Sequence, residues 1–103
     1  MISIRVILVD DHEVVRLGLL TLLEDIPWVR VVAEAGSAQE AQRVVEQYRP
    51  DVVVMDIRLP DESGIEVCRS ITTNWPQIQV IMLTSSGDEE LIFKALQAGA
   101  SGY

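Results

Sequence analysis

Val52-Val53-Val54-Met55-Asp56 is the stretch that decides the fold, because four apolar residues in a row lead directly into a carboxylate. Short, β-branched runs of this kind form strands that are buried on both faces, as in a parallel sheet. We therefore predict a central strand over residues 52–55 with Asp56 at its carboxyl end.

Three further strands are predicted by similar apolar runs at residues 6–9, 29–35 and 78–83. Segments with helical periodicity separate them. Helices are expected over residues 38–48, where Ser37 and Glu40 form a capping box, over residues 65–75, and from Asp88 to Gly99. Before these, a first helix is predicted from one apolar stripe made of Val15, Leu19, Leu22 and Ile26.

The alternation of strand and helix predicts an α/β domain, a doubly wound parallel sheet with helices on both faces and right-handed crossovers. We expect the flavodoxin-like strand order 2-1-3-4-5, with the functional site at the carboxyl ends of the first and third strands. Residues 99–103 resemble the turn into a fifth strand. We therefore expect one domain over residues 1–103, truncated at the start of that strand.

Composition excludes several classes of function. The net charge is −8 with eight scattered basic residues, so this segment is not expected to bind a nucleic-acid backbone. The single cysteine, Cys68, allows no internal disulfide and forms no zinc motif, which favours a reducing, cytoplasmic setting. We expect no signal peptide and no membrane-spanning segment.

Polar side chains follow three of the predicted strands: Asp10 and Asp11 the first, Asp56 the third and Thr84 the fourth. Parallel strands bring these residues to one edge of the sheet. Two carboxylates about 4 Å apart repel by roughly 1 kcal/mol in water and about 4 kcal/mol near a protein surface. A cation would offset this repulsion, and an all-oxygen ligand set favours Mg²⁺ or Mn²⁺ over zinc.

Such a site suits phosphoryl chemistry, because Mg²⁺ held by one or two carboxylates has room for a phosphate oxygen. Asp56 is the candidate acceptor, since aspartate is a known covalent nucleophile in phosphoryl transfer. Asp10 and Asp11 are the candidate metal ligands, and Thr84 can donate its hydroxyl to a phosphoryl oxygen.

Structural interpretations compete with these roles. Asp10 and Asp11 could form a solvated turn that caps the first helix, and Asp61 reads as a turn or cap residue. His12 is expected at the surface or behind the metal ligands rather than as a catalytic base. Cys68 is expected to be a residue through which its helix packs.

The chain resembles the receiver domains of two-component response regulators, in particular the NarL/FixJ (LuxR-type) subfamily. The similarity covers essentially the whole chain and depends on the order of several short motifs. These are Val9-Asp10-Asp11-His12-Glu13, Arg16-Leu17-Gly18-Leu19, residues 51–56 with Leu59-Pro60 and Gly64, Leu83-Thr84, and Ala98-Gly99-Ala100-Ser101-Gly102-Tyr103.

The resemblance implies roles for the matched positions. Asp11 matches the direct Mg²⁺ ligand, Asp10 the acid that acts through water, and Asp56 the phosphoacceptor and second ligand. Arg58 stands where the family supplies a backbone carbonyl to the metal.

Two further positions match the residues that respond to phosphorylation. Thr84 matches the switch hydroxyl and Tyr103 the switch aromatic. The family's phosphoryl-pairing lysine would follow three residues after Tyr103, beyond this sequence.

The implied function is phosphorylation-dependent signal reception, not classical enzymatic catalysis. The implied partners are a sensor histidine kinase, a second copy after phosphorylation, and DNA only through a C-terminal helix-turn-helix domain that these residues do not include. A stand-alone relay or interaction receiver is the alternative. A haloacid-dehalogenase-type phosphatase loses support, because that class requires a second aspartate where Arg58 stands.

Overall fold

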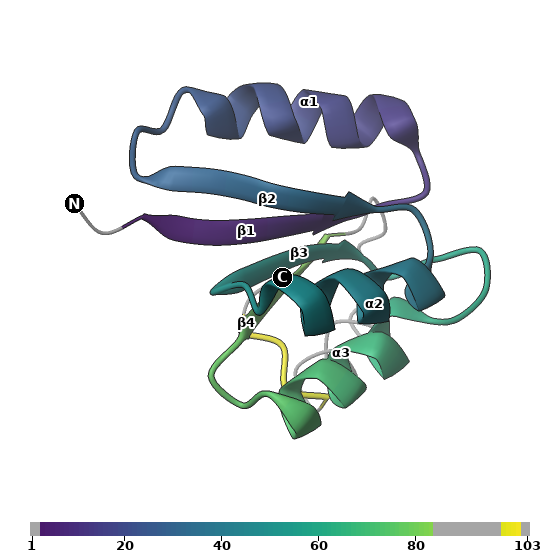
Figure 1. The fold of residues 1–103 in the computed structure, drawn as a ribbon. Coiled ribbons are helices and arrows are strands. Elements are labelled where there is room, and N and C mark those ends of the chain that lie inside the picture. The colour runs from purple at the N-terminus through teal and green to yellow at the C-terminus, as the bar shows by residue number, and fades with distance from the viewer. Residues whose placement is uncertain (1–2, 84–97, 102–103) are drawn as a thin grey trace.

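The computed structural model describes residues 3–83 and 98–101, which form a sheet with helices on both faces (Figure 1). The predicted fourth helix, Thr84 and Tyr103 lie outside the described residues. The described elements, in chain order, are β1 (Ile4–Val9), α1 (Glu13–Glu24), β2 (Val29–Ala35), α2 (Ala38–Tyr48), β3 (Val52–Asp56), α3 (Gly64–Asn74) and β4 (Gln79–Leu83).

The four strands pair in parallel in the order β2-β1-β3-β4, which confirms the predicted order for this part of the sheet. In the pairing of β1 with β3, Val9 lies opposite Met55. The next residues along the two strands are Asp10 and Asp56. The register therefore brings these two carboxylates to the same edge of the sheet.

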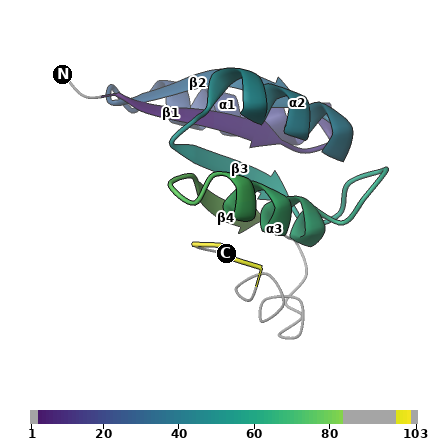
Figure 2. The same cartoon turned by 60° about the horizontal axis from the view of Figure 1, so that its bottom comes forward.

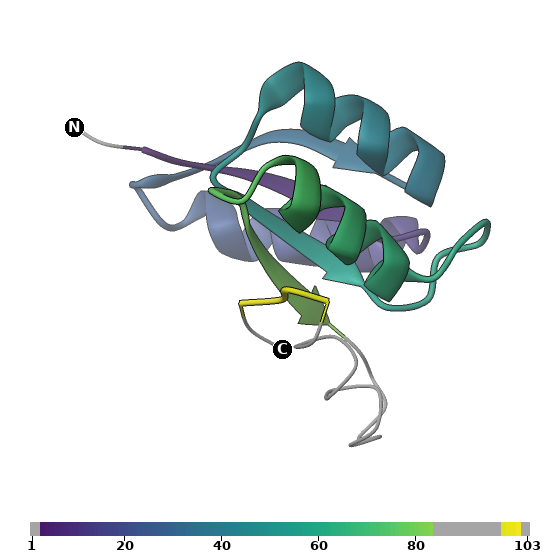
Figure 3. The same cartoon turned by 90° about the horizontal axis from the view of Figure 1, so that it is seen from below.

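Helix α1 covers one face of the sheet, and α2 and α3 cover the other (Figures 1 and 3). The predicted stripe of α1 is wrong in part, because Val15 and Leu22 are exposed and Ile26 follows the end of the helix. Leu19, Leu20 and Leu23 are half-buried instead. Apolar residues lie almost all around α1, so their spacing could not identify the face that packs on the sheet.

The main core lies between the sheet and the α2–α3 layer. Inward-facing residues of β3 and β4, such as Met55 and Met82, are fully buried there. Cys68 of α3 is fully buried among them, as expected for a packing residue, and burial raises the pKa of its thiol to about 11. This core fixes the orientation of β3 and the direction in which its last residue leaves the sheet.

Residues 98–101 lie against α3 and β4 (Figure 2). The backbone N–H of Ser101 donates to the carbonyl of Val80 at 2.7 Å, as the first residue of a neighbouring strand would. The hydroxyl of Thr72 donates to the carbonyl of Ala98 at 2.9 Å. Gly99 makes the turn with a φ of +104°, a conformation that favours glycine.

Among the described helices, none combines the length and the apolar character needed to cross a lipid bilayer.

Candidate functional site

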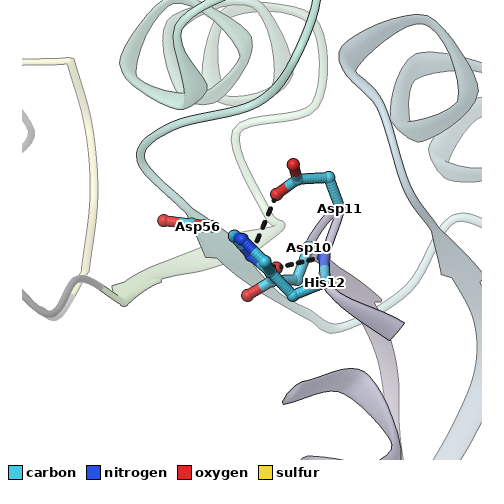
Figure 4. Close-up of side chains that lie close together, drawn as sticks. All are labelled: Asp10, Asp11, His12 and Asp56. Carbon is cyan, nitrogen blue, oxygen red and sulfur yellow. Dashed lines mark hydrogen bonds and ion pairs between the residues drawn. The ribbon is translucent and has the colours of Figure 1, made fainter. Parts of the chain in front are cut away.

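Four polar side chains meet at the carboxyl edge of the sheet: Asp10, Asp11, His12 and Asp56 (Figure 4). One ligand atom from each lies within 4.8 Å of those of all the others. The first three residues form the turn from β1 into α1, and Asp56 is the last residue of β3. The structure thus brings together the three predicted carboxylates and adds an imidazole.

Asp10 is the most buried of the three acids and is held by several hydrogen bonds. It is 6% exposed, and its Oδ1 accepts a hydrogen bond of 2.8 Å from the backbone N–H of His12. Its own carbonyl accepts from the guanidinium of Arg16 on α1, whose Nε lies 3.4 Å from a carboxylate oxygen of Glu34 on β2. Arg16 therefore ties the end of β1 to its neighbouring elements.

Asp56 is the half-buried acid of the group. Its Oδ1 accepts a hydrogen bond of 3.3 Å from the backbone N–H of Arg58. The pKa of Asp56 is raised above its ordinary value, first by burial and also by the negative charges of Asp10 and Asp11, against the opposing effect of the Arg58 hydrogen bond. A positive charge in the site would offset the repulsion between Asp56 and the other two acids.

His12 lies at the surface beside the predicted metal ligands, as the sequence led us to expect. Its Nδ1 lies 2.9 Å from Oδ1 of Asp10 and 3.1 Å from Oδ1 of Asp11. The hydrogen bond to Asp10, followed by the charges of Asp11 and Asp10, raises the pKa of His12. His12 follows the two acids directly and occupies the N-cap position of α1.

The loop after β3 is closed at its base by backbone contacts. The N–H of Gly64 donates to the carbonyl of Ile57 at 2.6 Å, and Arg58 pairs with Ser63 in an antiparallel bridge. A Cβ at Gly64 would lie 2.1 Å from the carbonyl oxygen of Asp56, so only glycine fits. The proposed metal-binding carbonyl of Arg58 belongs to this closed loop, whereas the Arg58 side chain is exposed.

Asp61 lies in the same loop but outside the acidic cluster, and it acts as a cap, one of the two roles expected for it. Its two carboxylate oxygens accept from the backbone N–H groups of Ala38, at 2.8 Å, and Gln39, at 3.1 Å. These bonds at the N-terminus of α2, the one to Ala38 first, lower the pKa of Asp61. Asp61 thus connects the loop after β3 to the start of α2.

The donor set fits a hard divalent cation, because three carboxylates converge and only one is strongly buried. Asp11 and Asp56 are the accessible pair, and both have oxygen atoms left for an ion. Thr84 and Tyr103, the predicted switch residues, lie outside the described residues.

The sequence pattern of the response regulator receiver domain family matches residues 6–103. The chain is also 51% identical over 100 residues to the DNA-binding transcriptional activator DevR/DosR of Mycobacterium tuberculosis. That match covers 97% of this chain and 46% of the relative, so the chain spans just under half the relative's length.

Solved structures agree with the fold. A LuxR-family two-component response regulator from Aurantimonas sp. superposes with a TM-score of 0.93 and 42% identity, covering 98% of this chain and 72% of that one. The isolated receiver domain of RcsB from Salmonella enterica, determined with the phosphomimetic BeF3-, gives 0.91 and 26% identity, covering 97% and 75%.

Proposed function

We propose that this chain, which belongs to the response regulator receiver domain family, takes a phosphoryl group from a sensor histidine kinase onto Asp56. The observation that carries the proposal is the convergence of Asp10, Asp11 and Asp56 at the carboxyl ends of adjacent parallel strands. Three acids crowd one edge, although burial and then the charges of Asp10 and Asp11 raise the pKa of Asp56.

In the proposed reaction, a carboxylate oxygen of Asp56 attacks the phosphorus of the kinase's phosphohistidine. The P–N bond breaks and its electron pair returns to the imidazole, which takes up a proton. The product is an acyl phosphate. Water then attacks its phosphorus, the bond to the Asp56 oxygen breaks, and inorganic phosphate leaves, which returns Asp56 to the carboxylate. The chain is therefore proposed to catalyse its own phosphorylation and slow dephosphorylation.

Mg²⁺ is the proposed cofactor, and when bound it would neutralise charge on the phosphoryl oxygens. The proposed ligands are Asp11, Asp56 and the carbonyl of Arg58, with Asp10 acting through water. The contacts of Asp10 with His12 and Arg16 would hold the start of this ligand set in place. The closed loop after β3 would do the same for Arg58.

The proposed output is a conformational switch through Thr84 and Tyr103. Phosphorylation adds about −1.5 to −2 of charge at Asp56, which these two residues would detect by changing their packing. In the full protein we propose control of a DNA-binding domain of the helix-turn-helix type, because the DevR/DosR relative is a DNA-binding activator about twice as long as this chain. A stand-alone relay receives less support from that comparison.

We also propose a cytoplasmic location and pairing of phosphorylated copies. The pairing follows from the resemblance to receiver domains, which commonly associate when phosphorylated. A shift of the sedimentation coefficient toward that of a dimer upon phosphorylation would bear this out.

The phosphoacceptor is tested by incubating the full protein with acetyl phosphate and Mg²⁺ and measuring its intact mass. The wild type should gain one phosphoryl group, and Asp56→Ala should gain none. Asp51→Asn is the matched control, since it removes a carboxylate at the opposite end of β3 and should label like the wild type. Equal labelling of Asp56→Ala and wild type would move the acceptor to another residue.

A further inference from the structure

We propose that Arg16 of α1, packed against Gly36, is a positioning residue that sets how much Mg²⁺ the proposed reaction requires. Its guanidinium lies outside the acidic cluster and acts on it through the backbone of Asp10. The inference rests on the proposed function, and it adds a residue that contacts neither the ion nor the phosphoryl group.

The backbone of Asp10 is held at both of its polar groups. Its N–H donates to the carbonyl of Ala35, at the end of β2, at 3.0 Å, and its carbonyl accepts from Nη1 of Arg16. The carbonyl of Asp10 and the nitrogen and Cα of Asp11 belong to one planar peptide. Holding that oxygen therefore fixes the plane from which the side chain of Asp11, the proposed direct ligand, starts.

Gly36 provides the space that the guanidinium occupies. A Cβ at this position would lie 3.2 Å from Nη1 of Arg16 and 4.0 Å from the carbonyl oxygen of Asp10. Gly36 does not have a positive φ, so its backbone conformation would suit other residues. The structural requirement for glycine here is therefore room for the contact between Arg16 and Asp10.

The burial of Arg16 makes it a poor source of stability. Its side chain is 20% exposed, and the contact of Nε in the described part of the chain is an ion pair of 3.4 Å with Glu34 that lacks hydrogen-bond alignment. Burying a charge whose hydrogen bonds are incomplete costs free energy. A charge-assisted bond to the Asp10 carbonyl accounts for an arginine at this place better than its contribution to the fold does.

Two effects of Arg16 on cation binding have opposite signs. The positive charge of the guanidinium repels a cation, so removal of the charge alone would strengthen Mg²⁺ binding. The contact with the Asp10 carbonyl keeps a carboxylate oxygen of Asp11 within 4.8 Å of one of Asp56, so loss of this contact would weaken Mg²⁺ binding. Weaker binding after loss of the charge therefore identifies positioning and has the wrong sign for electrostatics.

The test measures the Mg²⁺ concentration that gives half the maximal rate of labelling by acetyl phosphate, followed by intact mass in the full protein. Arg16→Met keeps an unbranched side chain with similar helix propensity but has no donor. We expect this Mg²⁺ concentration to rise about tenfold, as is typical when a group that orients a metal ligand is removed. The change should appear in this concentration more than in the rate at saturating Mg²⁺.

Arg16→Lys separates the charge from the geometry of the contact. It keeps a positive charge and three donors on one nitrogen, but it lacks the fork that reaches the Asp10 carbonyl and Glu34 together. We expect a rise in the half-maximal Mg²⁺ concentration that is smaller than in Arg16→Met.

Gly36→Ala displaces the guanidinium without removing it, and it tests the inference even if Arg16→Met does not fold. The added methyl group should raise the half-maximal Mg²⁺ concentration. Gly18→Ala is the matched control, because a Cβ there meets nothing within 4 Å, and it should resemble wild type. Asp51→Ala controls for stability, since it weakens the fold before β3 without touching the site and should keep the wild-type requirement.

Three results would overturn the inference: an unchanged or lower half-maximal Mg²⁺ concentration in Arg16→Met, equal concentrations in Gly36→Ala and Gly18→Ala, or a rise in Asp51→Ala as large as in Arg16→Met. Each would leave the proposed function intact, provided that wild type is labelled on Asp56. Absence of labelling in wild type at every Mg²⁺ concentration would contradict the proposed function and the inference together.

Discussion

Strand β3 is preceded by one aspartate and ends in another, and the two residues differ in almost every physical respect. Asp51, just before the strand, is paired with backbone: its Oδ2 accepts from the N–H of Arg5 at 2.8 Å, and its own N–H donates to the Arg5 carbonyl at 2.9 Å. Asp56, at the far end, faces two more acids and has a raised pKa.

The difference separates an aspartate that supports the fold from one that is available for chemistry. The carboxylate of Asp51 accepts a hydrogen bond from the backbone of Arg5, whereas burial and the negative charges of Asp10 and Asp11 oppose ionisation of Asp56. Perturbed acids of this kind concentrate at functional sites. If the two ends of β3 differ in this way, substitutions at each end should have different effects.

The largest change in stability is expected where the backbone of Gly64 passes close to the carbonyl oxygen of Asp56. Gly64→Ala places a methyl group 2.1 Å from the carbonyl oxygen of Asp56. The other nearest atoms belong to the backbone of Ile57, so no side chain can move away to make room. We expect a loss of about 3 kcal/mol or more in the free energy of unfolding, measured by urea denaturation, because overpacking against backbone is poorly relieved.

Gly18→Ala is the control for that substitution. A Cβ at Gly18 in α1 would meet nothing within 4 Å, so the variant should be as stable as wild type or gain about 0.5–1 kcal/mol from helix propensity. Similar losses in both variants would mean that the contact between Gly64 and Asp56 is not tight.

A matched pair of alanine substitutions compares the two aspartates directly in metal-free protein. Asp51→Ala should lose about 1 kcal/mol of stability, because the N–H of Arg5 loses its acceptor. Asp56→Ala should gain up to about 1 kcal/mol, because burial of the carboxylate and repulsion from Asp10 and Asp11 outweigh the lost hydrogen bond from Arg58. Chemical denaturation with a chelator present measures both, and destabilisation by both substitutions would remove the contrast.

The smallest expected effect is on the pH dependence of stability. The raised pKa of folded Asp56 means that the folded protein binds this proton more tightly than the unfolded chain does. The stability that protonated Asp56 contributes to the fold is thus present at low pH. It is lost as pH rises from the ordinary pKa of 3.8 through the raised pKa of the folded protein. The stability difference between Asp56→Asn and wild type should therefore grow as pH rises through this window.

Asp61 should give a pH dependence of stability opposite to that of Asp56. Its lowered pKa gives stability that is present above its ordinary value and is lost as pH falls through the lowered value. Asp61→Asn should therefore be less stable than wild type near neutral pH, with the difference shrinking in acid. A flat pH profile for both differences would contradict the electrostatic contrast.

Much of the fold could be predicted because the local patterns were unambiguous. The apolar run of β3 and the alternation of the other elements gave the parallel order, and Ser37 marked the start of α2 at the residue where the helix begins. The same order placed Asp10, Asp11 and Asp56 at one edge. Strand register then converted positions in the sequence into neighbours in space.

Features that depend on three-dimensional contacts could not be predicted. The sheet-facing side of α1 was ambiguous, because apolar residues surround that helix. The direction of the His12 ring depends on two carboxylates placed by the turn after β1, and spacing alone cannot give a side-chain orientation. Asp61 was expected to be a turn or cap residue, but its partners at Ala38 and Gln39 lie more than twenty residues away.

The Asp56 end of the sheet is proposed to be a cation site shared by Asp11 and Asp56. Crystals soaked with Mn²⁺ test it most directly, through the anomalous difference map. We predict one strong peak at coordination distance, about 2.1–2.2 Å, from a carboxylate oxygen of each of these residues. A map without a peak between Asp11 and Asp56, from crystals in which Mn²⁺ binds elsewhere on the protein, would contradict a cation site shared by these two residues.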